Sequence, residues 1–181
     1  MKTKGNTILV TGGASGIGRA LAEVFHAQGN TVIVAGRRRA ALDAVVAANP
    51  GMIAMELDVA DPAAVTAFAA AITAAHPALN VVVNNAGIMV PEQMTAAPAN
   101  LAVAEAMVIT NLLGPIRLTA ALLPHLMAQP AASIVTVSSG LAFVPLVATP
   151  TYSATKAAIH SWSMAIRRQL AETSVEVIEI A

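Results

Sequence analysis

The chain has 181 residues, equal numbers of basic and acidic side chains, and charged residues at 11% of its positions. Because no basic block occurs, we expect neither nucleic acid nor a membrane surface as a partner, and a small molecule is the better candidate. Cysteine is absent and the four histidines have no short ligand spacing, so the sequence predicts no disulfide and no metal site. The length fits a single domain over residues 1–181, and the start does not resemble a secretion signal, so we expect a cytoplasmic protein.

Short runs of β-branched residues alternate with longer alanine-rich stretches, which is the pattern of a parallel sheet with crossover helices. Strands are predicted at residues 7–10, 31–35, 52–57, 81–83, 133–137 and 175–180. Helices are predicted at residues 16–28, 38–48, 62–75, 100–127 and 151–172. Pro115 and Pro124 predict a kink or an early stop in the fourth helix. The alternation predicts an α/β fold, a doubly wound Rossmann-type sheet of six strands, with its ligand site at the carboxyl ends of the strands.

The chain is rich in apolar residues, and no Asp, Glu, Lys or Arg occurs between Leu118 and Thr155. Prolines and polar residues divide this stretch into pieces shorter than the roughly 20 apolar residues that a membrane helix needs. We therefore expect no membrane span, and we assign the excess apolar residues to strands that are buried on both faces and to helices that pack against another subunit.

Tyr152 and Lys156 lie four positions apart in the last predicted helix, in the run TYSATKAAIHSW, and such positions share one helix face. A free tyrosine has a pKa of about 10 and is a poor acid-base catalyst at neutral pH. A positive charge about 4 Å away favours the phenolate by up to about 4 kcal/mol at an effective dielectric near 20. The pair is therefore a candidate proton donor, although an ordinary exposed helix pair has the same spacing.

A glycine-rich segment, residues 11–18 (TGGASGIG), joins the first predicted strand to the first helix. Gly12, Gly16 and Gly18 permit a sharp turn and a close approach of the backbone to a phosphate at the helix N-terminus. Their spacing, Gly-x-x-x-Gly-x-Gly, differs from the Gly-x-Gly-x-x-Gly of many dehydrogenases. The segment predicts a dinucleotide site, although a tight strand-to-helix connection would also use these glycines.

Over nearly its whole length the chain resembles the short-chain dehydrogenase/reductase family, and within it bacterial oxidoreductases of the DltE-like type. Residues 11–18 are similar to the family's cofactor loop, and residues 84–87 (NNAG) to the motif after its fourth strand. Asn111 lies in the long helix where the family has its catalytic asparagine, and Tyr152 follows Ser139 by the family's 13 positions. The resemblance implies hydride transfer between a nicotinamide cofactor and an alcohol or carbonyl substrate.

The resemblance also implies a role for each residue of the site. Tyr152 is expected to be the general acid-base, and Lys156 to favour its phenolate and bind the nicotinamide ribose. Ser139 is expected to hold the substrate oxygen, and Asn111 to hold a water that links Lys156 to solvent. Ser138 is interpreted as a cap for local backbone. Cofactor contacts are expected from Gly12, Ser15, Gly16, Ile17, Gly18, Arg37, Arg38, Asp58, Val59, Asn85, Ala86, Gly87, Tyr152 and Lys156.

Coenzyme preference is expected to depend on the end of the second strand, where an acidic residue would bind the ribose 2′-hydroxyl and select NAD. This chain instead has arginines at positions 37–39, and an arginine pairs with a 2′-phosphate, so NADP(H) is favoured while NAD(H) stays possible. Ser15 weakens that preference, because many NADP-preferring relatives have a basic residue there. Asp58 matches the residue that contacts the adenine amino group, and Asp61 suits the cap of the following helix better.

Family members normally continue beyond the sixth strand with a Pro-Gly turn, a substrate-binding helical segment and a seventh strand, which the sequence ending at Ala181 lacks. The sixth strand is then expected to be an open sheet edge. Three expectations follow: an NADP-preferring oxidoreductase, a non-catalytic dinucleotide-binding module, and an inactive fragment of such an enzyme.

Two apolar segments, residues 89–91 and 141–147 (LAFVPLV), predict a pocket mouth suited to a hydrophobic alcohol or carbonyl, although core or interface positions would have the same composition. In the family, two helices usually pack across a subunit interface. The predicted helices at 100–127 and 151–172 are the candidates, so we expect a homodimer or homotetramer.

Overall fold

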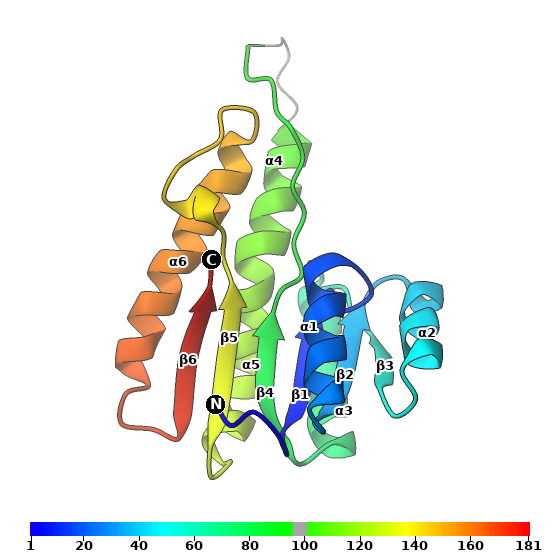
Figure 1. Ribbon diagram of the computed structural model, residues 1–181. Coiled ribbons are helices and arrows are strands. Elements are labelled where there is room, and N and C mark those ends of the chain that lie inside the picture. Colours follow the sequence, from blue (N-terminus) through cyan, green and yellow to red (C-terminus); the bar gives the residue numbers. More distant parts are fainter. Residues whose placement is uncertain (96–100) are drawn as a thin grey trace.

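A parallel six-stranded sheet forms the centre of the protein, in the order β3-β2-β1-β4-β5-β6 (Figure 1). We describe it from a computed structural model that defines residues 1–95 and 101–181. The strands are β1 (Thr7–Thr11), β2 (Thr31–Gly36), β3 (Ile53–Glu56), β4 (Leu79–Asn84), β5 (Ala132–Val137) and β6 (Val175–Ile180). The six predicted strands are thus confirmed. The strand order reverses between β1 and β4, and ligands of such sheets bind beside the carboxyl ends of the strands at this point.

Helices cover both faces of the sheet, α1 and α2 on the face toward the viewer in Figure 1 and the others behind it. They are α1 (Gly16–Ala27), α2 (Arg39–Ala48), α3 (Pro62–Ala75), α4 (Leu101–Val108), α5 (Gly114–Met127) and α6 (Pro150–Gln169). A π-helical segment, Ile109–Leu113, joins α4 to α5, and a 3-10 turn, Gly140–Ala142, follows β5. This turn is not among the predicted elements, and α6 ends at Gln169, before the predicted end at residue 172.

The predicted helix over residues 100–127 continues through both of its prolines. Pro115 is the second residue of α5, with one residue between it and the π-helical segment, and Pro124 lies inside α5. Because proline has no N–H, a regular helical hydrogen bond is missing at each of these positions, and an irregular turn beside Pro115 accommodates one of the gaps. Of the two predicted outcomes, a kink or an early stop, the early stop does not occur, and a π-helical segment precedes Pro115. The predicted start at Asn100 lies outside the described residues.

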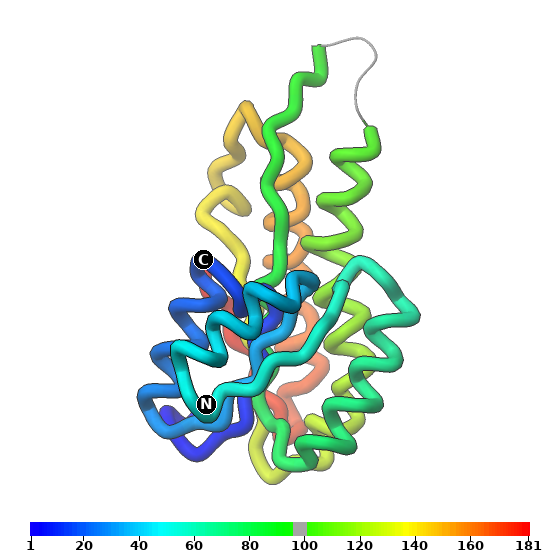
Figure 2. Tube along the Cα trace, turned by 90° about the vertical axis from the view of Figure 1, so that its right-hand side faces the viewer, coloured from blue at the N-terminus to red at the C-terminus, as the bar shows by residue number. Residues whose placement is uncertain are grey.

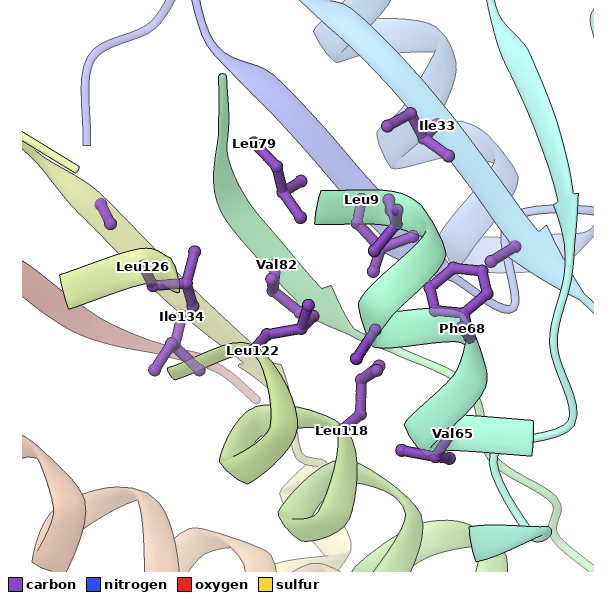
Figure 3. Close-up of a cluster of buried hydrophobic side chains, with 14 of the residues drawn as sticks. Leu9, Ile33, Val65, Phe68, Leu79, Val82, Leu118, Leu122, Leu126 and Ile134 are labelled. Carbon is purple, nitrogen blue, oxygen red and sulfur yellow. The ribbon is translucent and has the colours of Figure 1, made fainter. Parts of the chain in front are cut away.

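Two hydrophobic clusters lie on opposite faces of the sheet. The larger one packs Leu9 and Val82 of the strands against Phe68 of α3 and Leu118 of α5 (Figure 3). The other cluster packs α1 and α2 against the opposite strand faces. Consecutive residues of β1, such as Ile8, Leu9 and Val10, are fully buried, which explains why the strands are continuously apolar.

One helical stretch, Leu101–Met127, is long and apolar enough to cross a membrane by length and composition alone. In the structure its α5 part lies against the sheet, where Leu118, Leu122 and Leu126 are fully buried in the larger cluster. The same composition is therefore explained by a helix of the protein core.

Three asparagines connect the amino-terminal ends of the central strands. Asn30 Oδ1 accepts hydrogen bonds from the Asn6 N–H and from Asn6 Nδ2, at 3.0 and 2.9 Å. Asn80 Oδ1 accepts from the Thr7 N–H at 3.0 Å, and Asn80 Nδ2 donates to Asn6 Oδ1 at 3.1 Å. Asn6 and Asn30 are buried, so this network replaces water at the bottom of the sheet.

Candidate active site

The glycine-rich loop after β1 is tightly packed on one side and open on the other. Gly12 has a φ of 67°, and a Cβ atom at Gly18 would lie 2.3 Å from Asn85 Nδ2. Only glycine fits at Gly18, because no real Cβ atom approaches another atom so closely. At Gly16, with a φ of 53°, a Cβ atom would have no neighbour within 4 Å. The open side of the loop therefore lies at the start of α1.

The N-terminus of α1 keeps its capacity to bind an anion. The helix has no acidic residue in its first turn, and the side chain of Ser15 does not cap it. Instead, Ser15 Oγ accepts a hydrogen bond from Arg38 Nη2 at 3.2 Å, across from the end of β2. A guanidinium, a hydroxyl and uncapped helix N–H groups thus meet at one place, and together they suit a phosphate.

The segment after β4 is held to the glycine loop through Thr11. Thr11 Oγ1 accepts hydrogen bonds from the N–H groups of Asn85 and Ala86 at 3.0 and 3.1 Å. Asn85 Nδ2 donates to the Thr11 carbonyl oxygen at 2.9 Å, whereas Asn84 Nδ2 points away and donates to Thr119 Oγ1 of α5 at 3.0 Å. Asn85 and Ala86 therefore border the site, while Asn84 fastens the sheet to a helix.

A cleft of about 490 Å³ lies at the carboxyl ends of the strands, within the size range of ligand pockets. It is lined by most of the residues for which the sequence predicts a cofactor contact: Gly12, Ser15, Gly16, Ile17, Arg37, Arg38, Asp58, Val59, Asn85, Ala86, Gly87, Tyr152 and Lys156. Three predicted residues, Gly18, Asn111 and Ser139, do not line it.

Ten further residues line the cleft and were not among the predicted contacts: Thr11, Ala14, Ala35, Gly36, Leu57, Ile88, Met89, Thr110, Val137 and Ser138. Most of them are chain neighbours of predicted residues at the ends of β1, β2, β4 and β5. These residues could have been predicted from their position at a strand end, but not from the chemistry of their side chains. Leu57 and Val137 show that apolar residues also line the cleft.

Tyr152 and Lys156 meet in the lining of the cleft. Lys156 Nζ lies 5.6 Å from the centroid of the Tyr152 ring and donates a hydrogen bond to the Val137 carbonyl oxygen at 2.8 Å. Lys156 is 5% exposed, and burial lowers its pKa below the usual range of a lysine. The bond to Val137 uses one of three N–H donors, so two remain for a neighbour or a ligand. This burial does not fit an ordinary exposed helix pair.

Ser138 and Ser139 use their hydroxyl groups differently. Ser138 Oγ donates to the Ile180 carbonyl oxygen at 3.3 Å, so it ties β5 to β6 rather than capping local backbone as expected. Ser139 Oγ accepts a hydrogen bond from the Leu141 N–H at 3.1 Å. Among the described residues, no acceptor takes the hydroxyl hydrogen of Ser139. That hydrogen therefore stays available, although Ser139 is not among the residues that line the cleft.

Asn111 is a buried bridge in the π-helical segment. Its Oδ1 accepts from the Ile88 N–H at 2.8 Å, and its Nδ2 donates to the Ile88 carbonyl oxygen at 2.8 Å and to Thr155 Oγ1 at 3.2 Å. The side-chain amide thus holds the backbone after β4 against α6. The sequence analysis assigned Asn111 to the site but did not predict this clamp, because it depends on contacts between distant segments.

Two aspartates between β3 and α3 have separate tasks. Asp61 caps α3 by accepting hydrogen bonds from the N–H groups of Ala63 and Ala64 at 2.8 and 3.2 Å, so the prediction for this residue is confirmed. Asp58 lines the cleft, and its Oδ1 accepts from the Ala60 N–H at 3.0 Å. Its second carboxylate oxygen can accept a hydrogen bond from a ligand.

The donors and the free space of the cleft fit a nicotinamide dinucleotide. The open side of the loop at Gly16 and the N-terminus of α1 suit its pyrophosphate, and Asp58 suits an amino group of its adenine. Tyr152 and Lys156 lie in the same lining, where they can bind hydroxyl groups and exchange a proton. In the described part of the chain, no group of His, Asp and Glu side chains could hold a metal ion.

Comparison with known proteins identifies the family. A family model described as short chain dehydrogenase matches residues 6–181. The chain is 45% identical to DltE, an uncharacterized oxidoreductase of Bacillus subtilis, over all of this chain and 72% of the relative. A solved short-chain dehydrogenase from Streptomyces avermitilis is similar with a TM-score of 0.89 and 35% identity, over 96% of this chain and 64% of that one. The closed form of serine dehydrogenase complexed with NADP⁺ is similar with a TM-score of 0.87 and 30% identity, over 96% of this chain and 71% of that one. The chain therefore belongs to the short-chain dehydrogenase family of oxidoreductases.

Proposed function

We propose that the protein transfers hydride between a nicotinamide cofactor, preferably NADP(H), and a hydrophobic alcohol or carbonyl compound, with Tyr152 as the general acid-base. The observation that carries this proposal is the meeting of Tyr152 with the buried Lys156 in the lining of the cleft that the glycine loop borders. When bound, the cofactor supplies or accepts the hydride. The side chains of the protein then have to move the matching proton.

Tyr152 moves that proton at its phenolic oxygen. In reduction it donates the proton to the carbonyl oxygen of the substrate, and in oxidation its phenolate takes the proton from the alcohol. The ammonium of Lys156 stabilises the phenolate in both directions. Ser139 donates a hydrogen bond to the same substrate oxygen, which its uncommitted hydroxyl hydrogen supports.

The preference for NADP(H) is supported by the charges at the end of β2. Arg37 and Arg38 line the cleft where an acidic residue would select NAD. Arg38 also reaches Ser15, so a basic group lies next to the position where many NADP-preferring relatives have one. A 2′-phosphate would gain charge-assisted hydrogen bonds from this pair of side chains.

The preference for a hydrophobic substrate is supported by exposed apolar side chains in the segments that follow β4 and β5, one of which, Met89, lines the cleft. They come from the two segments that the sequence analysis identified, and they are Met89, Val90, Phe143, Val144, Leu146 and Val147. Such side chains gain free energy when an apolar substrate covers them.

A substrate panel tests the proposed reaction. We expect hydrophobic carbonyl compounds to be reduced faster with NADPH than with NADH, and Tyr152→Phe to lower kcat by about 10²-fold or more, the size of a lost general acid. NADPH binding, followed by its fluorescence, should stay within about twofold in this variant, because the mutation removes one hydroxyl group. Full activity of Tyr152→Phe would contradict the assignment. NADPH binding without turnover of any carbonyl would instead indicate a non-catalytic dinucleotide-binding module.

We also propose that the protein is a cytoplasmic homodimer or homotetramer that pairs through α4, α5 and α6. These helices leave large apolar side chains exposed, namely Leu101, Val108, Met127 and Met164. Burial of these side chains against a second copy would be favourable. Light scattering at micromolar concentration should give at least twice the mass of the chain, and a monomer mass would contradict the proposal.

A further inference from the structure

The segment after β4 is connected to the beginning of α6 by the carboxylate of Glu92. Oε2 of Glu92 accepts a hydrogen bond from the Thr151 N–H at 2.8 Å, and Oε1 accepts one from Thr151 Oγ1, also at 2.8 Å. The Glu92 N–H donates to the Ala148 carbonyl oxygen at 2.9 Å. Three hydrogen bonds therefore join residues that are far apart in the sequence. Thr151 directly precedes Tyr152.

The beginning of α6 needs such a partner because it has no cap of its own. Pro150 has no N–H, the side chain of Thr149 makes no capping hydrogen bond, and the first turn contains no acidic residue. A carboxylate at a helix N-terminus satisfies free N–H groups and interacts favourably with the helix dipole. Glu92 supplies this carboxylate from a different segment, so it fixes the position of the helix as well as capping it.

The same segment is fastened at its other end. Asn111 holds both backbone groups of Ile88 and donates to Thr155 Oγ1 of α6. Thr151 and Thr155 lie four residues apart on α6, one position before Tyr152 and Lys156 respectively. The chain from Ile88 to Glu92 therefore runs along the first turns of α6, and Figure 2 shows it rising from the sheet as part of the green tube between β4 and α4.

We propose that Glu92 is a positioning residue for the reaction, which holds Tyr152 at the cleft by fixing the first turn of α6 against the segment from Ile88 to Glu92. Glu92 does not line the cleft, whereas Ile88 and Met89 of the same segment do. Its effect therefore passes through Tyr152 rather than through contact with a ligand. This role rests on the function proposed above. Loss of Glu92 should disturb the catalytic end of the cleft and leave the phosphate end unchanged.

Glu92→Ala tests the role, with Glu92→Gln as the conservative variant that keeps one carbonyl acceptor. Asp61→Ala is the matched control, because Asp61 also caps a helix with a carboxylate and α3 contributes no residue to the cleft lining. Four quantities are measured: hydrogen exchange of the Thr151 amide, the ¹³C signal of the tyrosine ring, kcat, and the dissociation constant of NADPH. Tyr152 is the single tyrosine of the chain, so its signal needs no assignment.

In Glu92→Ala we expect faster exchange of the Thr151 amide, a shifted tyrosine signal, and kcat lowered about tenfold or more, since small displacements of a catalytic group have large effects. The dissociation constant of NADPH should stay within about twofold, and Glu92→Gln should restore most of kcat. In Asp61→Ala the melting temperature should fall, while kcat and the tyrosine signal stay unchanged.

Three results would overturn the role of Glu92: an unchanged Thr151 exchange rate and tyrosine signal in Glu92→Ala, an unchanged kcat in that variant, or an equal loss of kcat in Asp61→Ala. If the unaltered protein has no turnover, the proposed function fails separately. A shifted tyrosine signal in Glu92→Ala would then still support the proposal that Glu92 holds Tyr152 in position.

Discussion

The two ends of the sheet have similar polar side chains but use them in opposite ways. At the amino-terminal end, the side chains of Asn6, Asn30 and Asn80 pair with one another and with nearby backbone groups. At the carboxyl-terminal end, Lys156 and Ser139 keep donors that are not used within the site. Buried polar groups stabilise a fold when all of their donors and acceptors have partners within the protein. They can bind ligands when some donors or acceptors have no partner.

The two ends of the sheet also differ in how their polar side chains affect the stability of the fold. None of the three asparagines lines the cleft at the carboxyl ends of the strands, and their side chains bond to one another and to nearby backbone, so we expect this network to contribute to stability rather than to ligand binding. Lys156, in contrast, is buried, and burial lowers its pKa because desolvation disfavours the charged form. Burial of this lysine therefore lowers the stability of the fold at the carboxyl end while it provides a reactive group, a combination that is common at functional sites.

Asn30→Ala should have the largest effect on stability and none on binding. It removes the acceptor for two hydrogen bonds from the buried Asn6, so we expect the free energy of unfolding to fall by about 2–4 kcal/mol. Urea denaturation measures this change, and NADPH titration should give an unchanged dissociation constant. Asn49→Ala is the control, because Asn49 is less buried and lies at the end of α2. A similar loss of unfolding free energy in both variants would show that the amino-terminal network stabilises the fold no more than the hydrogen bonds of Asn49 at the end of a helix.

Arg38→Ala should have the opposite pattern, with weaker NADPH binding and unchanged stability. The lost charge-assisted contact to a 2′-phosphate should raise the dissociation constant of NADPH about tenfold, while that of NADH stays within about twofold. Arg39→Ala is the matched control, since Arg39 is an exposed neighbour that pairs with Asp43 of its own helix. If NADH binding weakens as much as NADPH binding, Arg38 does not select the coenzyme.

Lys156→Met should change how stability depends on pH, and this is the smallest of the expected effects. Because burial lowers the pKa of Lys156 in the folded protein, the unfolded chain binds more protons at pH values between that lowered pKa and the ordinary lysine value near 10.5. The unaltered protein should therefore gain stability as the pH rises through this window, relative to Lys156→Met. Urea midpoints measured from neutral pH upward compare the two proteins. A relative loss of stability with rising pH would show that the fold favours the charged lysine.

Much of the fold and of the cofactor site was predictable from local patterns. Apolar runs located the strands, and the glycines, Arg37, Arg38 and Asp58 lie at strand ends, where parallel topology brings them together. Asp61 was predictable as a cap because the capping partner is only two or three residues away.

Contacts between distant segments were not predictable in this way. Glu92 looked like any polar loop residue, because its partner Thr151 is 59 positions away and no local pattern connects them. The same holds for Asn111, which lies in the π-helical segment and binds Ile88, 23 positions away. Helix prediction treats Pro115 as a stop, whereas packing against the sheet continues the helix through it.

The tight contact between Gly18 and Asn85 divides the cofactor loop into two parts with different freedom to evolve. A side chain at Gly18 would collide with Asn85 and with the Gly12 carbonyl group, and because a backbone carbonyl is present in every residue type, a substitution of Asn85 would not make room for it. Ser15 of the loop is exposed, as are Arg37 and Arg38 after β2, and a replacement at these positions displaces no packed neighbour. Coenzyme specificity can therefore be redesigned, by natural selection or in the laboratory, without rebuilding the turn that makes coenzyme binding possible.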